Sequence, residues 1–204
     1  KQMKSSPSKE GIEIQKLTDE QLILSFQQGN INAYNEIVAR FKDRLTNFVF
    51  RYVGSYDDCD DIVQDTFVKV YTSKHLYKEI AKFSTWIYTI AINLAKTKLA
   101  RQQKYKTFSI SDVYDDESKD FDIPDEAFTP DVDANSKFLS KHIQKALDMI
   151  NENYRELVVL RDVEDYSYEE IVEMTGLPMG TVKSRINRGR EKLQELLKDI
   201  YKEE

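Results

Sequence analysis

The sequence contains very little of what several protein classes require. Its 204 residues include a single cysteine, Cys59, which excludes an internal disulfide framework and suits a reducing cytosol. One cysteine and two distant histidines, His75 and His142, are too few ligands for a structural zinc site. No apolar run approaches the roughly 20 residues that a membrane-spanning helix needs, which argues against a transmembrane protein. Six glycines and four prolines favour a helical protein.

Charge is plentiful but unevenly distributed. The net charge is −6, yet residues 107–136 alone carry −9, which leaves +3 on the remaining 174 residues. Five basic residues and no acidic one fall within 96–106, and five basic residues with one acidic residue fall within 183–192. Two basic patches separated by an acidic connector suit a nucleic-acid partner better than the total charge suggests.

Apolar periodicity predicts an all-α fold. Thr18 and Gln21 form a capping box that opens a short helix, and the strongest apolar stripe runs from Tyr34 to Tyr52. Two more helices are expected over about 57–72 and 84–103. We expect these four helices to form one bundle domain over residues 17–106, preceded by a mobile tail at residues 1–16.

A second small helical domain is expected over residues 137–204. It follows an acidic, flexible linker at residues 107–136, which contains two prolines and no sustained apolar period. Within it, Ser167 opens a capped helix that stops at Gly176, and a long basic helix begins near Met179. A short capped helix, a turn and a longer basic helix are typical of a helix-turn-helix.

The last helix has the residues that reading a DNA duplex requires. A turn of 100° per residue places Val182, Ile186 and Gly189 inward and basic or polar side chains outward or on the flanks. Arginine and lysine can pair with guanine edges, asparagine can pair with adenine, and flanking arginines can bind phosphates. A basic solvated helix is the plain alternative. The candidate DNA-reading residues are Thr181, Lys183, Ser184, Arg185, Asn187, Arg188 and Arg190.

Residues 82–106 combine aromatic side chains with a basic tail. We assign Phe83 and Trp86 to the core. An amide such as Asn93, midway along a helix, carries a mild propensity cost and needs a partner. Aromatic and cationic side chains together can hold an unpaired strand. The candidates for this contact are Asn93, Lys96, Lys98 and Arg101.

Several aspartates cluster at the start of the third expected helix. Helical spacing puts Asp61, Gln64 and Asp65 on one face, whereas the carboxylates of 57–61 wrap around the first turn, near the positive end of the helix dipole. This cluster is either a charged helix start or an acidic docking face for a basic partner, with a metal site a weaker option. No nucleophile–His–carboxylate group, phosphate-binding glycine loop or Rossmann pattern is present, so no catalytic site, metal or cofactor is expected.

Three segments of the sequence resemble bacterial extracytoplasmic-function (ECF) sigma factors, the smallest class of RNA polymerase sigma factors. They are DDIVQDTFVKVY (60–71), FSTWIYTIAINLAK (83–96) and DYSYEEIVEMTGLPMGTVKSRINRGREKL (165–193), in that order within a similarity over about 17–200. The resemblance implies a region 2 domain, a linker and a region 4 domain. It also implies a subunit that gives RNA polymerase promoter specificity and has no catalysis of its own.

The resemblance implies specific roles as well. Asp61, Gln64 and Asp65 match family residues that dock on the coiled coil of the polymerase β′ subunit. Asn93 matches a residue that helps to capture a base flipped from the −10 element, beside a loop at Tyr77–Lys82. The positions that match −35-reading residues are Lys183, Ser184, Asn187 and Arg188.

The resemblance implies partners and a location too. The expected partners are core RNA polymerase, through its β′ coiled coil and β flap, promoter DNA, and an anti-sigma protein, which is often membrane-bound for relatives. The chain itself is expected to be cytoplasmic, without membrane insertion, and a monomer when bound to polymerase.

Three other interpretations stay open at this point. A stand-alone helix-turn-helix repressor or activator would explain the C-terminal helices but leave the Asp61 face and the Asn93 helix without a role. A metal nuclease built on 57–65 would lack a supporting base. A sigma-like protein that binds polymerase without initiating is the third.

Overall fold

The computed structural model describes residues 13–109 and 134–200, and all regular elements within these two stretches are helical. Most of the expected N-terminal tail (1–16) and most of the expected linker (107–136) lie outside the described residues. The predicted all-α class is confirmed. None of the described helices is both long and apolar enough to cross a bilayer.

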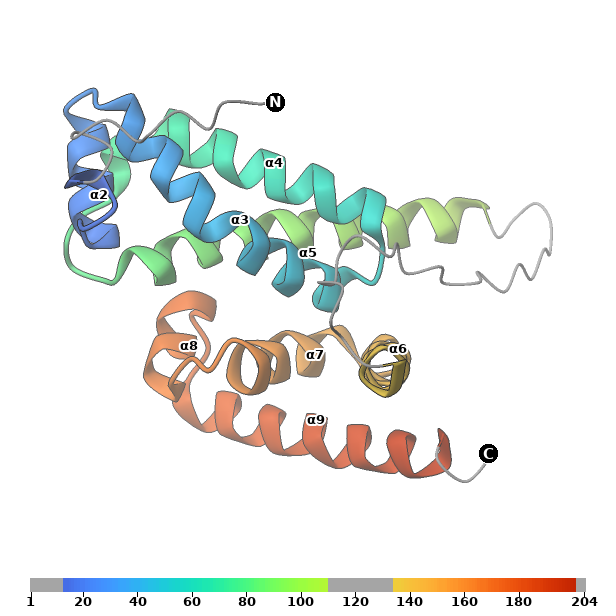
Figure 1. Cartoon of the computed structure of the whole chain (residues 1–204). Helices are drawn as coiled ribbons and strands as arrows, with labels where there is room; N and C mark the ends of the chain where they lie inside the picture. The colour runs from blue at the N-terminus through green and yellow to red at the C-terminus, as the bar shows by residue number, and fades with distance from the viewer. Residues whose placement is uncertain (1–12, 110–133, 201–204) are drawn as a thin grey trace.

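The described residues form two groups of helices (Figure 1). The N-terminal group contains α2 (Asp19–Gln27), α3 (Ile31–Val53), α4 (Tyr56–Ser73), the 3₁₀ turn η1 (Lys74–Leu76) and α5 (Phe83–Ser109). The C-terminal group contains α6 (Ala134–Met149), α7 (Glu152–Val158), the π-helical segment η3 (Val159–Val163), α8 (Tyr168–Thr175) and α9 (Met179–Ile200). We call them the N-terminal and C-terminal domains.

The helix ends follow the predicted capping signals. Thr18 and Gln21 make both hydrogen bonds of the capping box at the start of α2, at 2.9 and 3.2 Å. Gly54 ends α3 in the left-handed conformation, with φ 75°, which glycine adopts without a steric penalty. A second capping box at Ser167 and a left-handed Gly176 enclose α8. Helix α5 continues to Ser109, beyond the predicted end near 103, because no glycine or proline interrupts it.

The N-terminal domain packs around the apolar stripe of α3. Ile37, Phe41, Leu45 and Phe48 are fully or almost fully buried there, among side chains of α4 and α5. Phe83 is buried as well, and the partly buried Trp86 packs against the core, so both core assignments are confirmed.

The segment after α7 departs from the prediction of a single short helix over 154–163. The α-helix ends at Val158, and the next residues form a wider π-helical turn in which the Glu164 N–H donates to the Val159 oxygen at 3.1 Å. Asp165 then adopts a positive φ of 60°. This turn directs Glu164 and Tyr166 towards the N-terminal domain.

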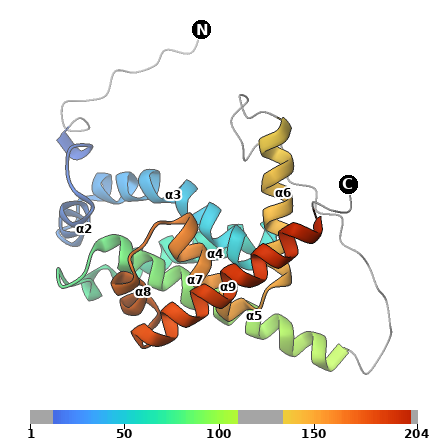
Figure 2. The same ribbon diagram turned by 90° about the horizontal axis from the view of Figure 1, so that it is seen from below.

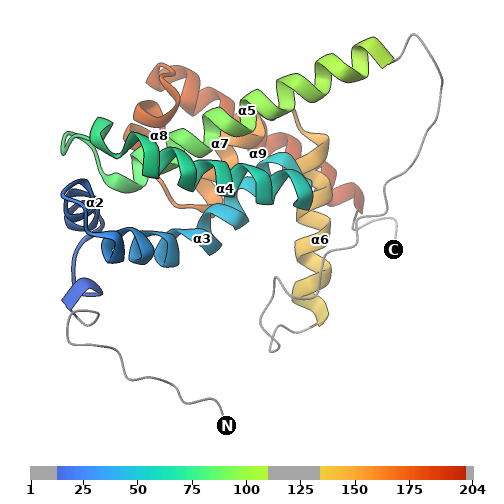
Figure 3. The ribbon, with the colours of Figure 1, turned by 90° about the horizontal axis from the view of Figure 1, so that it is seen from above.

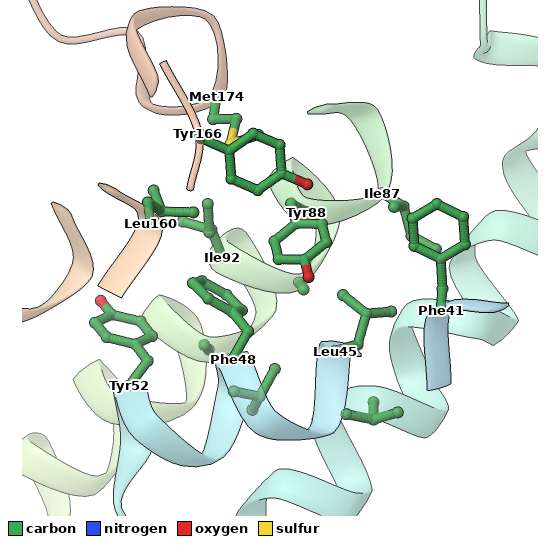
Figure 4. Close-up of a cluster of buried hydrophobic side chains, with 14 of the residues drawn as sticks. Phe41, Leu45, Phe48, Tyr52, Ile87, Tyr88, Ile92, Leu160, Tyr166 and Met174 are labelled. Carbon is green, nitrogen blue, oxygen red and sulfur yellow. The ribbon is translucent and has the colours of Figure 1, made fainter. Parts of the chain in front are cut away.

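The two domains share one apolar core, which the sequence did not predict. Figure 4 shows Phe48 and Tyr52 of α3 and Tyr88 and Ile92 of α5 beside Leu160, Tyr166 and Met174 of the C-terminal domain. The rings of Tyr88 and Tyr166 lie 5.1 Å apart between centroids, nearly edge to face. Seen from below and from above, the C-terminal helices cross α3 and α5 (Figures 2 and 3).

Arg155 fixes one end of this interface. Its guanidinium donates to the main-chain oxygens of Tyr52 and Asp148, both at 2.9 Å, and lies 3.5 Å from the Asp148 carboxylate. A Cβ atom on Gly54 would come within 2.6 Å of Oδ1 of the same carboxylate, so a larger residue at position 54 would force the Asp148 side chain to shift.

Candidate polymerase and nucleic-acid interfaces

Helix α4 exposes one acidic face. Asp61, Gln64 and Asp65 are all exposed, whereas the opposite side of the helix is buried in the N-terminal core. The predicted shared face is therefore confirmed, and its role in docking stays a prediction. Val68 and Tyr71 continue this face with half of their surface exposed. Sequence reasoning missed both, although Val68 lies three residues after Asp65 and Tyr71 three residues after Val68, a spacing that could have indicated them.

The acidic face is tied to α5 by a lysine. The Lys98 ammonium lies 3.1 Å from the Asp58 carboxylate and 3.2 Å from that of Asp61. Burial alone would raise the pKa of Asp58, but hydrogen bonds from Gln102 and Lys98 bring it below its ordinary value. Hydrogen bonds to Asp58 and Asp61 in turn raise the pKa of Lys98. Lys98, a predicted strand-binding residue, is thus paired with the acidic face in this structure.

The other candidate strand-binding residues on α5 are in different environments. Asn93 and Arg101 are exposed. The Lys96 ammonium lies 2.9 Å from Glu156 of the C-terminal domain, whose side chain is only 3% exposed. The four residues therefore do not form one free surface.

An aromatic cluster lies just before and within the first turn of α5. The rings of Tyr77, Phe83 and Trp86 lie 5.6 to 5.9 Å apart between centroids. The Tyr77 hydroxyl donates to the main-chain oxygen of Ala81 at 2.9 Å and so closes the loop that precedes α5. This loop exposes 89% of Ile80, an apolar surface at the position that the resemblance assigns to the border of the flipped-base pocket.

Helices α8 and α9 form the predicted helix-turn-helix. Val182 and Ile186 are completely buried, and Gly189 packs directly on α7, so the predicted inward face of α9 is confirmed. The outward residues are presented to solvent. Lys183, Ser184, Asn187, Arg188 and Arg190 are exposed, and Thr181 and Arg185 are partly exposed.

One of the candidate DNA-reading residues already has a partner within the domain. Arg190 pairs with Asp162 of η3, with 3.0 Å between Nε and Oδ2. The hydrogen bond to Asp162 raises the pKa of Arg190. The pair is exposed, so it costs little to exchange for a phosphate.

Comparison with known proteins assigns both domains. The family Sigma-70 region 2 matches residues 37–105, and the family Sigma-70, region 4 matches residues 140–193. A region 2 followed by a region 4 defines a sigma factor of the sigma-70 class, the class that directs RNA polymerase to promoters.

Relatives that align over almost the whole chain identify the subclass of sigma factor. The ECF RNA polymerase sigma-E factor of Haemophilus influenzae is 31% identical over 189 residues, which cover 91% of this chain and 98% of that protein. The sigma-E factors of Salmonella typhimurium and Escherichia coli are each 32% identical over 191 residues, covering 92% of this chain and 98% of theirs. The chain therefore belongs to the ECF family of RNA polymerase sigma factors. It is a transcription initiation factor that gives promoter specificity, and it is not an enzyme.

Two solved structures share the fold. The sigma factor RpoE of Bartonella quintana, solved with the anti-sigma factor NepR, has a TM-score of 0.65 and 24% identity, covering 81% of this chain and 96% of that one. CnrH, solved with the cytosolic domain of CnrY, has a TM-score of 0.65 and 23% identity, covering 89% of this chain and 97% of that one.

Proposed function

We propose that the two domains of this alternative sigma factor divide promoter recognition between separate, solvent-exposed helix faces. Residues 17–106 act as region 2, which binds core polymerase and the −10 element, and residues 137–204 act as region 4, which binds the −35 element. The observation that carries this proposal is the exposure of polar residues on α4, α5 and α9, helices whose opposite sides are buried in the core.

The α4 face is the proposed contact with the polymerase β′ coiled coil. Asp61, Gln64 and Asp65 supply carboxylates and an amide for a basic partner, and Val68 and Tyr71 add apolar surface beside them. Charged residues steer the encounter, while apolar side chains at the centre of an interface contribute most of the affinity. Region 4 would contact the β flap.

Helix α5 is the proposed site of −10 strand capture. Asn93 would hydrogen-bond an unstacked base, and Lys96 and Arg101 would bind phosphates. Stacking of a captured base against an aromatic side chain would stabilise the open promoter by about 1–3 kcal/mol. We assign Lys98 a structural role instead, because its ammonium pairs with Asp58 and Asp61 and so holds α4 against α5.

Helix α9 is the proposed reader of the −35 duplex. Lys183, Asn187 and Arg188 lie on its outward face, where such side chains can reach base edges in the major groove. Arg185 and Arg190 would bind phosphates, which gives salt-dependent affinity and fixes the register.

An anti-sigma protein is the proposed regulator, and the cytoplasm the proposed location. The Bartonella quintana sigma factor that shares the fold is bound to an anti-sigma factor, which supports such a partner here. A monomeric sigma bound to polymerase would act in the cytoplasm. A stand-alone repressor is the weaker candidate, because it gives no role to the exposed α4 face.

A matched pair of charge reversals tests the proposal. Asp61→Lys places a cation in the proposed docking face, whereas Asp60→Lys makes the same charge change at an exposed neighbour one residue away. We expect Asp61→Lys to lower the affinity for core RNA polymerase by at least about 100-fold, or roughly 3 kcal/mol, and Asp60→Lys to change it little. Equal affinities of the two variants in a binding titration would rule out the docking assignment.

A further inference from the structure

A row of glutamates from the C-terminal domain lies along α5. Each one contacts a different residue of α5 or of the loop before it. The pairs are Lys82 with Glu170 at 2.8 Å, Tyr88 with Glu164, Lys96 with Glu156 at 2.9 Å, and Gln103 with Glu152 at 3.3 Å. They connect the two domains along almost the full length of the basic helix.

The two central glutamates are nearly enclosed. The side chains of Glu164 and Glu156 are 7% and 3% exposed. The Tyr88 hydroxyl donates to Glu164 from a fully buried ring. A buried carboxylate is costly without partners, so these contacts define one arrangement of the domains and not a loose association.

Burial acts in the same way on the two central glutamates, although different side chains surround them. Burial raises the pKa of both Glu164 and Glu156 despite the partners that oppose it. The groups that face them are Tyr88, Arg44 and Arg51 around Glu164, and Lys96, Arg185 and Glu152 around Glu156.

The contacted residues share one side of α5. Tyr88, Lys96 and Gln103 follow one another at intervals of eight and seven residues, close to two helical turns each. Asn93 lies about 60° around the helix from Lys96 and is exposed. Lys96 therefore belongs both to the domain contact and to the edge that we assign to the −10 strand.

We propose that region 4 is an intramolecular competitor of the −10 strand, and that its Glu156 occupies Lys96, a position on α5 where a phosphate of the captured strand would bind. This inference rests on the proposed role of Asn93 and Lys96. While Glu156 pairs with the Lys96 ammonium, its carboxylate offsets the lysine charge and repels an approaching phosphate, so capture of the strand favours separation of the domains there.

The closed arrangement leaves the other two proposed surfaces open. Asp61 on α4 and Asn187 on α9 remain exposed while Lys96 is paired with Glu156. The competition therefore acts on strand capture alone. Free sigma could meet polymerase and duplex DNA while its hold on single-stranded DNA stays weak.

A charge reversal at the interface tests the competition. Glu156→Lys sets a second cation against Lys96 and so opens the contact, whereas a neutral substitution would not, because burial raises the pKa of Glu156 and favours its neutral form in the closed chain. The control, Glu169→Lys, makes the same charge change at an exposed position of the same domain, and circular dichroism checks that both variants keep their helicity. The probe is a fluorescein-labelled, random-sequence single-stranded 12-mer, followed by anisotropy at low salt.

We expect the interface variant to bind the 12-mer with a lower Kd than the intact chain, because only the open fraction of the intact chain can bind. If one intact chain in ten is open, the Kd should fall about tenfold. The control should bind only slightly more tightly than the intact chain. An equal gain in both variants would mean that net charge alone controls binding, which would overturn the competition.

Energy transfer between dyes on the two domains gives an independent readout. Cysteines at the exposed positions 42 and 194 (Lys42→Cys, Gln194→Cys) can carry the dyes, because the native Cys59 is buried. Binding is reciprocal, so the 12-mer should change the transfer in the intact chain towards that of the interface variant.

The outcomes separate this inference from the proposed function. An interface variant that is open by energy transfer but binds the 12-mer no better than the intact chain overturns the competition and leaves the promoter assignments in place. An open variant that binds no single strand at all overturns the −10 assignment itself.

Discussion

Gly189 on the recognition helix gives a sharp test of the packing in region 4. A Cβ atom at this position would lie 2.6 Å from Cγ2 of Val158 and 3.2 Å from Cβ of Tyr154, both on α7. Val158 is almost fully buried, and a β-branched side chain in a helix has few rotamers with which to yield. Gly189→Ala should therefore cost about 1–3 kcal/mol through overpacking. The helical preference for alanine offsets about 1 kcal/mol of that cost.

Gly180 supplies the matched control, because it lies in the same helix with nothing within 4 Å of its would-be Cβ atom. Gly180→Ala should stabilise the protein by up to about 1 kcal/mol. Urea denaturation, followed by circular dichroism at the helical band, measures both variants. We expect Gly189→Ala to be the less stable of the two by about 1–3 kcal/mol. If both substitutions stabilised the protein equally, α9 could not lie as close to α7 as the structure places it.

The remaining predictions concern the domain contact and the −10 site. Arg155→Met should destabilise the protein by about 3 kcal/mol, because it removes the donor to the main-chain oxygens of Tyr52 and Asp148 and the cation beside the half-buried Asp148 carboxylate; urea titration measures this loss, and an unchanged midpoint would contradict it. Burial raises the pKa of Glu156 and Glu164 in the closed chain, so the closed form binds protons more tightly than the open one. Energy transfer should therefore show closure strengthening as the pH falls from about 7.5 towards 5, and the reverse trend would refute this. Glu170, whose pKa is lowered, should oppose closure only below about pH 4.5. Asn93→Ala should reduce opening of the −10 element by about tenfold or more, while −35 binding stays intact. Equal permanganate reactivity of promoter thymines with mutant and wild type would count against the assignment.

The helices and their ends were predictable because local signals determine them. The stripe from Tyr34 to Tyr52 became the buried face of α3, and the capping residues Thr18 and Ser167 start α2 and α8 as expected. The inward face of α9 was equally readable, since its helical period separates Val182 and Ile186 from the basic side.

The packing of the two domains was not predictable from the same signals. An apolar period shows that a face is buried but does not name its partner. Tyr88 was recognised as an aromatic residue, yet nothing local indicates that it meets Tyr166. Glu156 would be expected on the surface, because glutamate is almost never buried unless it is paired. Its partner Lys96 is about 60 residues away in the chain.

In the candidate site, too, local signals predict which residues are exposed but not which distant residues they pair with. Exposure and shared faces could be inferred for Asp61, Gln64 and Asp65 from helical spacing alone. The partners that occupy Lys96, Lys98 and Arg190 could not, because each pair joins elements whose relative position depends on tertiary structure.

Run-off transcription with bacterial core RNA polymerase and a promoter library tests the central claim most directly. The account predicts new transcripts only when this chain is added, from promoters that share two sequence motifs at a fixed spacing. Asp61→Lys should abolish them, and Asp60→Lys should not. If the chain binds core polymerase but no such transcripts appear, the assignment as a promoter-specific initiation factor is contradicted.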